Sequence, residues 1–329
     1  MAKITDVAAK AGVAKSTVSN VLTGNKFVSD ELKRKVLAAC AELDFHPNFF
    51  ASGLSRNKTN IIALLLENNA DVSRNTFYSE LIIACLSEAS EKGYSLLIYY
   101  NSDKNKLLDA LRQGRAPVDG AILMSPCVND ERIAQMESDR ISCVVIGRPD
   151  NPVLNYVDVD NRKLTRTVAE RLIKAYGKDV YLINSMKSMT ISQDRQCGFT
   201  EACNEAGIDA ALHIFESAGG DEERGYEIAS SVMKKGISII TPNGRTARGV
   251  YRAANEAGLK IGKDVAVFAL GRSLSRGEFT PSLSYAAQDY GVLGRTAVDL
   301  LLEEIDNGRQ MEPVLVQSDV IVAESSPEF

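Results

Sequence analysis

Apolar residues in the first 45 positions recur at spacings of three and four, which predicts three short helices. The first covers residues 4–11 and we expect Thr5 to cap it, the second covers residues 14–22, and Ser29 begins the third. Gly12 separates the first two and predicts a tight turn with a positive φ angle. The residues that face inward in this pattern are Ile4, Val7, Ala8, Ala11, Val18, Val21, Leu22, Leu32, Val36, Leu37, Cys40 and Leu43.

Helix, short glycine turn and helix is the order of a helix-turn-helix unit, whose second helix enters the major groove of DNA. The outward face of the second predicted helix carries Lys15, Ser16, Ser19 and Asn20. One lysine among short donors and acceptors suits phosphates and base edges. The alternative is a small three-helix bundle with a solvated polar face.

Residues 44–60, DFHPNFFASGLSRNKTN, join this head to the rest of the chain. Pro47 can begin a short helix. Phe49, Phe50 and Leu54 are apolar in a segment too short to bury them by itself, so we expect a partner chain or DNA to cover them.

From residue 60 onward, short apolar runs alternate with longer amphipathic segments, which predicts repeated βα units and parallel sheets with helices on both faces. Ligands then bind beyond the carboxyl ends of the strands. The predicted strands are 61–66, 95–100, 120–124, 142–147, 180–183, 212–215, 237–240 and 265–270. The predicted helices are 75–92, 104–113, 130–138, 161–176, 192–206, 222–235 and 245–257.

Charge divides the chain at the same place. The 329 residues carry a formal net charge of −5, which by itself argues against a nucleic-acid binder. Residues 1–60, however, hold nine Lys/Arg and five Asp/Glu, a net charge of +4, and the remainder carries −9. A basic head on an acidic body fits a protein that docks on DNA through its head alone.

Several chemistries find little support in the composition. The six cysteines form no CxxC pair, and we interpret them as reduced structural thiols. His46 and His213 are the only histidines, which leaves little for a zinc site or a Ser-His-Asp triad. No Walker sequence and no GxGxxG after a strand occurs, and no apolar run of ~18 residues could span a membrane. We therefore expect no enzyme, no cofactor and no metal, and the amphipathic N-terminus indicates a cytoplasmic protein.

Three stretches, DVAAKAGVAKSTVSNVLTG, VSDELKRKVLAACAELDFHPN and ASGLSRNKT, resemble the LacI/GalR (lactose-repressor) family of bacterial transcription regulators. The match is specific over residues 3–60 and looser beyond. The resemblance implies an all-α helix-turn-helix head with a hinge helix, and an α/β body like periplasmic binding proteins, built from two doubly wound parallel-sheet subdomains. The expected parts are a DNA-binding domain over 1–46, a hinge and linker over 47–59, and an effector-binding and dimerisation domain over 60–329. Within the last, the N-subdomain covers about 61–160 and 290–320 and the C-subdomain about 161–289 and 321–329, so the chain crosses near 160, 289 and 320.

The resemblance also assigns DNA contacts. Lys15, Ser16 and Asn20 match base-reading positions of the recognition helix. Residues 48–55 match the family's hinge helix, which folds in the minor groove, and Leu54 matches a leucine wedged between base pairs. Phe49 and Phe50 either pack between paired hinges or are exposed. The further positions assigned to DNA contact or helix positioning are Thr5, Thr17, Ser19, Asn25, Asn48 and Ala51.

The resemblance also assigns effector contacts to Phe77, Arg195 and Asn243. This sequence departs from the family at Gly244 and Gly147, where many relatives carry Asp. Because both changes remove negative charge and arginines lie nearby in sequence at strand ends, we hypothesise an anionic effector such as a phosphorylated sugar. The nearby arginines are Arg148, Arg245 and Arg272. The alternative is that they are surface residues, that another acid substitutes, and that the effector is neutral.

These features together predict a homodimeric, sequence-specific regulator, a repressor of carbohydrate-related genes, that reads a pseudopalindromic operator and answers to a small molecule. The helix at 75–92 and the segment near 290–305 are candidate dimer faces or plain core helices. The tail lacks heptads, which favours a dimer over a tetramer. A solute-binding protein for transport is the main rival, but the basic head argues against it.

Overall fold

The computed structural model describes residues 2–23, 26–45, 58–67, 76–101, 118–150, 154–217, 221–271, 277–308 and 311–329. They form two compact units, a head over Met1–Thr59 and a body over Asn60–Phe329. None of the helices in these ranges is long and apolar enough to cross a bilayer.

The head contains three helices, α1 (Ile4–Ala11), α2 (Lys15–Thr23) and α3 (Asp30–Glu42). Their shared core is formed by Val7, Ala8, Val18, Val36 and Ala39. Gly12 ends α1 in the left-handed region, at φ +64°, and this lets the chain turn into α2 within three residues.

The expectation that Thr5 caps α1 is wrong. The helix begins at Ile4, as predicted, so Thr5 lies within its first turn and Lys3 takes the cap position. Asp6 then takes the capping role, because its Oδ2 accepts a hydrogen bond from the Lys3 backbone N–H at 2.8 Å. Thr5 is left exposed on the first turn.

The body contains two six-stranded sheets, each doubly wound. The first has the order β11-β5-β4-β3-β1-β2 and all its described pairs are parallel. The second has the order β12-β10-β9-β8-β6-β7 and is parallel except for the β10–β12 pair. The predicted fold class is thereby confirmed.

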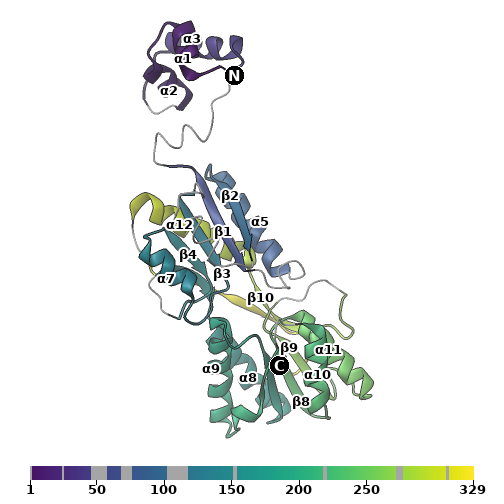
Figure 1. Cartoon of the computed structure of the whole chain (residues 1–329). Helices are drawn as coiled ribbons and strands as arrows, with labels where there is room; N and C mark the ends of the chain where they lie inside the picture. Colours follow the sequence, from purple (N-terminus) through teal and green to yellow (C-terminus); the bar gives the residue numbers. More distant parts are fainter. Residues whose placement is uncertain are drawn as a thin grey trace. The chain divides into compact units, whose positions relative to one another are not determined.

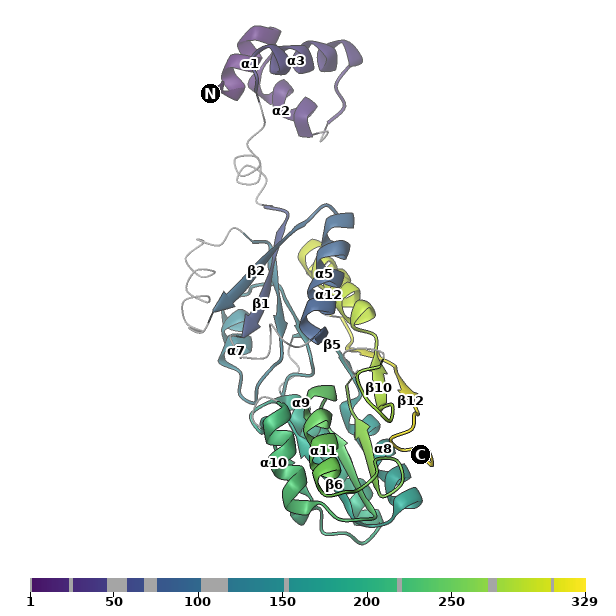
Figure 2. The same cartoon turned by 90° about the vertical axis from the view of Figure 1, so that its right-hand side faces the viewer.

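The first subdomain uses helices on both faces of its sheet (Figures 1 and 2). α5 and α12 pack side by side on one face, and α7 covers the other. Its elements are β1 (Ile61–Glu67), α5 (Thr76–Glu91), β2 (Ser95–Asn101), β3 (Gly120–Met124), α7 (Glu131–Ser138), β4 (Cys143–Ile146), β5 (Asn155–Val159), α12 (Tyr290–Asn307) and β11 (Val314–Val316).

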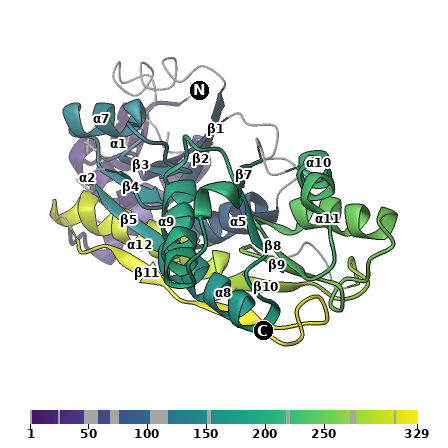
Figure 3. The same ribbon diagram turned by 90° about the horizontal axis from the view of Figure 1, so that it is seen from below.

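The second subdomain repeats the plan, with α8 and α9 on one face of its sheet and α10 and α11 on the other (Figure 3). Its elements are α8 (Asn161–Tyr176), β6 (Val180–Asn184), α9 (Thr190–Glu205), the 3-10 turn η1 (Ala210–Leu212), β7 (Ile214–Glu216), α10 (Glu222–Val232), β8 (Ile237–Thr241), α11 (Gly244–Glu256), β9 (Val265–Ala269), β10 (Ser284–Gln288) and β12 (Ser318–Ile321).

The chain passes between the subdomains three times, after β5, after β10 and between β11 and β12. These passages fall at Asp160, Asp289 and Gln317. Buried side chains from both subdomains, such as Ile122 of β3, Phe268 of β9 and Tyr290 of α12, belong to one continuous apolar cluster.

Some predicted elements differ from the structure. The strand expected at 212–215 begins at Ile214, because residues 210–212 form a 3-10 turn that leaves Leu212 71% exposed. The segment near 290–305 is a core helix, since α12 buries Leu293, Ala297 and Leu301. The helix predicted at 104–113 lies outside the described residues.

Candidate functional site

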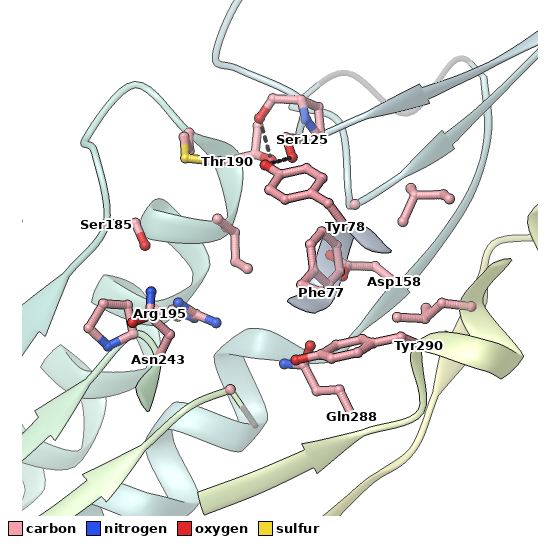
Figure 4. Close-up of a pocket in the computed structure, with 18 residues that line it drawn as sticks. Phe77, Tyr78, Ser125, Asp158, Ser185, Thr190, Arg195, Asn243, Gln288 and Tyr290 are labelled. Atoms are coloured by element: carbon pink, nitrogen blue, oxygen red, sulfur yellow. Dashed lines mark hydrogen bonds between the residues drawn. The ribbon is translucent and has the colours of Figure 1, made fainter. Parts of the chain in front are cut away.

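A cavity of about 160 Å³ lies between the two sheets of the body (Figure 4). It opens where strands of both sheets reach their carboxyl ends, as expected for doubly wound sheets. Its volume is below the range of about 300–1,000 Å³ that drug-sized ligands occupy, so it suits a molecule of monosaccharide size. Its polar lining residues are Tyr78, Ser125, Asp158, Ser185, Thr190, Arg195, Asn243, Gln288 and Tyr290.

An aromatic wall closes the side of the cavity that belongs to the first subdomain. Phe77 of α5 meets the rings of Tyr78 and Tyr290 edge to face, with centroids 5.0 and 4.9 Å away. The Tyr78 hydroxyl lies 3.1 Å from Ser125 Oγ (Figure 4). Such rings offer a flat apolar surface with polar tips, which suits the C–H face of a small polar ligand.

Arg195 supplies positive charge from α9 on the opposite side (Figure 4). The residue is only 5% exposed, and its Nε finds no hydrogen-bond partner among the described residues. Burial lowers the Arg195 pKa to about 10, so the guanidinium stays protonated at neutral pH. A buried cation with an unsatisfied donor is costly without a partner, and an acceptor group on a ligand would relieve that cost.

Asp158, at the end of β5, supplies negative charge. Burial raises the Asp158 pKa to about 6, although three donors oppose the shift by favouring the carboxylate. The backbone N–H groups of Val159 and Arg148 donate to it at 2.7 and 2.9 Å, and Asn161 Nδ2 at 3.3 Å. The carboxylate is thus held in place by the protein itself.

Asn243 links the cavity to a helix end. Its Oδ1 accepts the Thr246 backbone N–H at 3.0 Å and so caps α11. In Figure 4, Asn243 lies beside Arg195 in the second subdomain's half of the lining. Because Oδ1 is occupied by the cap, the amide nitrogen is the part left to meet a ligand.

The structure brings together Phe77, Arg195 and Asn243 from the predicted effector set, but Arg148 and Arg245 do not line the cavity. The Arg148 guanidinium is engaged by Asp194 at 2.6 Å. Arg272 lies outside the described residues.

The cavity has a carboxylate that sequence reasoning missed. The glycines at 147 and 244 each remove a carboxylate that many relatives carry, which suggested an anionic effector, but Asp158 lines the cavity. This agrees with the alternative that another acid takes the place of the aspartates that many relatives carry at positions 147 and 244. Asp158 was missed because polar residues at positions 155 and 158 interrupt the short apolar run that predicts a buried strand, and only its position in β5 reveals its place.

A second candidate surface lies on the head. In α2, Lys15 and Ser16 are exposed, and Ser19 and Asn20 are half-buried. Val18, between them, is fully buried and fixes which face of α2 points outward. Thr17 is half-buried on the same helix, and Asn25, Asn48, Ala51 and Leu54 lie outside the described residues.

Comparison with known proteins finds a matching family for the head and for much of the body. Residues 3–48 match the family described as bacterial regulatory proteins, lacI family, and residues 169–326 match a periplasmic binding protein-like domain. The HTH-type transcriptional repressor PurR of Erwinia tasmaniensis is 30% identical over 321 residues, covering 94% of this chain and 92% of the relative. The HTH-type transcriptional regulator RegA of Clostridium saccharobutylicum is 29% identical over 334 residues, 98% of each chain.

Solved structures agree on the fold. A lac repressor dimer bound to operator and the anti-inducer ONPF is similar with a TM-score of 0.85, at 22% identity over 99% of both chains. A complex of the transcriptional regulator CelR with cellobiose has a TM-score of 0.74, at 23% identity over 99% of this chain and 100% of the other.

Proposed function

The chain belongs to the lacI family of bacterial regulatory proteins and is a DNA-binding transcriptional regulator, and from this premise we propose that it is a cytoplasmic repressor controlled by a small molecule in the cleft. The observation that carries the proposal is Arg195, a buried cation whose Nε lacks a partner and which lines the cavity between the subdomains. A repressor of this kind answers to the compound that fills such a cavity.

The head reads the operator through α2. Lys15, Ser16 and Asn20 would meet base edges, and Thr5, Thr17 and Ser19 would meet phosphates or position the helix. Asn25 and the hinge positions Asn48, Ala51 and Leu54 would complete the contact, with Leu54 as a wedge in the minor groove. The charge of +4 on residues 1–60 and −9 on the rest orients the molecule so that only the head approaches phosphate.

Two heads would act together on a pseudopalindrome. The lac repressor is a dimer in its complex with operator. In this chain, α5 and the neighbouring strand β2 carry exposed apolar side chains, which would be covered in a homodimer. They are Ile83 at 65%, Leu86 at 49%, Ile98 at 45% and Tyr100 at 51% exposure.

The effector would be a small hydroxylated molecule, sugar-like in size, with one acidic group against Arg195. Asp158 already receives three donors, whereas Arg195 Nε is unsatisfied, so Arg195 is the charged group with hydrogen-bonding capacity left for a ligand. A carboxylate or phosphate would accept from it. Arg148 and Arg245 would contribute only if the cleft rearranged around the ligand, whereas Arg272 is proposed from the sequence alone. A phosphorylated sugar is one candidate ligand.

The DNA half of the proposal is tested by selecting binding sites from a random duplex library with the full-length protein. Inverted half-sites should be enriched, and Leu54→Ala should weaken binding to them in a gel shift across a range of salt. Failure to enrich any symmetric site would count against an operator-binding dimer.

The effector half is tested by calorimetry with neutral monosaccharides, their monophosphates and sugar acids. We expect an acidic member to bind more tightly than its neutral parent and to change operator affinity. Tight binding of a neutral sugar alone would overturn the proposal that the effector is acidic. The cleft would still be the proposed effector site.

A further inference from the structure

Arg148 and Asp194 form an ion pair that joins the two subdomains. Arg148 follows β4 in the first subdomain, whereas Asp194 stands in the second turn of α9 in the second. The guanidinium donates from Nε to Asp194 Oδ2 at 2.9 Å and from Nη2 to Oδ1 at 2.6 Å. The Asp194 partnership also raises the Arg148 pKa, as expected for a well-formed pair.

The pair is shielded from solvent more than most described ion pairs of this body, although Arg132–Asp130, within the first subdomain, is more deeply buried. The side chains are 34% and 15% exposed, compared with 61% and 28% for Arg162 and Glu201. A two-pronged contact in a partly dry place retains more of its Coulomb energy than an exposed pair does. Arg148–Asp194 is therefore able to hold two subdomains together, which exposed pairs seldom do.

Backbone contacts join the same two subdomains next to this pair. Residues 126–128 after β3 meet residues 188–190 at the start of α9, and Cys127 and Met189 form an isolated antiparallel bridge. The Val128 N–H donates to the Ser188 carbonyl at 2.8 Å, and the Thr190 N–H donates to the Pro126 carbonyl at 3.2 Å. These two amides report directly on whether the subdomains are in contact.

We propose that Arg148 and Asp194 are a positioning pair, a latch that holds the two walls of the cavity at the separation at which Arg195 and Asp158 face one ligand. The proposal deepens the effector function given above and rests on it for its role in regulation. The latch itself is a property of the body and exists without any effector.

The latch is connected to the cavity at both ends. On one side, the Arg148 backbone N–H donates to Asp158 Oδ2 at 2.9 Å, and Asp158 lines the cavity. On the other side, Asp194 precedes Arg195 in α9. A ligand that shifts Asp158 or Arg195 therefore moves an anchor of the latch, and this couples occupancy of the cavity to the contact between subdomains.

Hydrogen–deuterium exchange on the full-length protein without ligand tests the latch. Asp194→Asn and Arg148→Gln should each speed exchange of the Val128 and Thr190 amides about tenfold, the factor expected when a charged hydrogen bond is lost. Asp194→Glu, which keeps the charge, should restore part of the protection. The double variant should exchange no faster than either single variant, because both remove the same interaction.

Two controls make the result specific. Arg252→Gln removes an ion pair between α11 and α10 within the second subdomain, and it should leave the Val128 and Thr190 amides unchanged. Exchange in the central strand β8, far from the latch, should stay slow in every variant and so shows that the fold is intact.

The outcomes separate the latch from the proposed effector function. Unchanged exchange at Val128 and Thr190 in both single variants, or a double variant whose effect is the product of the two, would overturn the latch even if calorimetry finds an effector. Faster exchange with no effector found would support the latch and leave the effector proposal unsupported.

Discussion

Gly147 and Pro126 approach each other so closely at the cavity that a Cβ on Gly147 would lie 2.7 Å from Pro126 Cδ. Gly147 also has φ +110°, a backbone conformation that other residues adopt only with strain. The absence of a side chain at 147 is thus required by the shape of the cleft and is more than a loss of charge.

Gly147→Ala should destabilise the protein by about 1–3 kcal/mol, since strain and a clash add, and should weaken effector binding by displacing Pro126. Urea unfolding and calorimetry measure the two effects. Gly236→Ala is the matched control, because Gly236 has φ +87° but nothing within 4 Å of its Cβ position. An equal loss of stability in both variants would show that strain alone is responsible.

Arg195→Met should abolish the response to effector while leaving operator affinity intact. Removing a buried charge with an unsatisfied donor should also leave the free energy of unfolding unchanged or raise it by about 1–3 kcal/mol. Operator binding by fluorescence anisotropy, with and without effector, and denaturant titration measure these outcomes. Arg162→Met, on α8, is the control, and a strongly destabilised Arg195→Met would mean that the arginine is structural.

Asp158 should make stability depend on pH. Its folded pKa of about 6 lies above the unfolded value of ~3.9, so ionisation costs more in the folded state. The stability that the neutral acid provides is complete below the unfolded pKa and is lost as pH rises through about 6, a total of about 3 kcal/mol.

Asp158→Asn should therefore gain stability relative to the parent as pH rises from about 4 to about 7. Thermal unfolding across that range measures the difference. The exposed Glu312→Gln serves as control and should run parallel to the parent. A parallel course for Asp158→Asn would contradict the proposed cost of ionising Asp158.

Ile83→Asp should produce a monomer, because a charge would be placed on the exposed apolar side of α5. Loss of the second head should lower operator affinity by a factor of about 10²–10⁴, through lost avidity. Sedimentation velocity measures the oligomeric state, and a gel shift measures the operator affinity. Leu212→Asp, an equally exposed apolar site at 71%, is the control, and a dimeric Ile83→Asp would remove this surface from the interface.

Asn20→Ala should lower affinity for the selected operator by about 1–3 kcal/mol and relax the preference at one base pair, while leaving binding to random DNA unchanged. Competition gel shifts over single-base variants of the site measure this. Lys35 lies on α3 and its ammonium pairs with Glu31, so Lys35→Ala should change neither the affinity for the operator nor the base preference. A uniform loss on every sequence would mean that Asn20 contacts phosphate.

The helix-turn-helix head and the doubly wound body could both be predicted from the sequence, because local periodicity encodes them. Val7, Val18 and Val36 are spaced so that each helix buries one stripe, and the short apolar runs from Ile61 to Leu270 fit strands covered on both faces. Such patterns depend on a few neighbouring residues, so they can be recognised without knowing how the whole chain folds.

Which charged residues come together at the cleft depends on the tertiary structure. β5 contains buried Asn155 and Asp158, whose partners Glu304 and Arg148 are supplied by other parts of the chain, and so it does not look like a strand in sequence. From the sequence, Arg148 is a candidate ligand-binding arginine, but in the fold α9 places Asp194 within ion-pair distance of it. These pairings depend on the three crossings between subdomains, which join residues tens of positions apart, and local periodicity carries no information about such contacts.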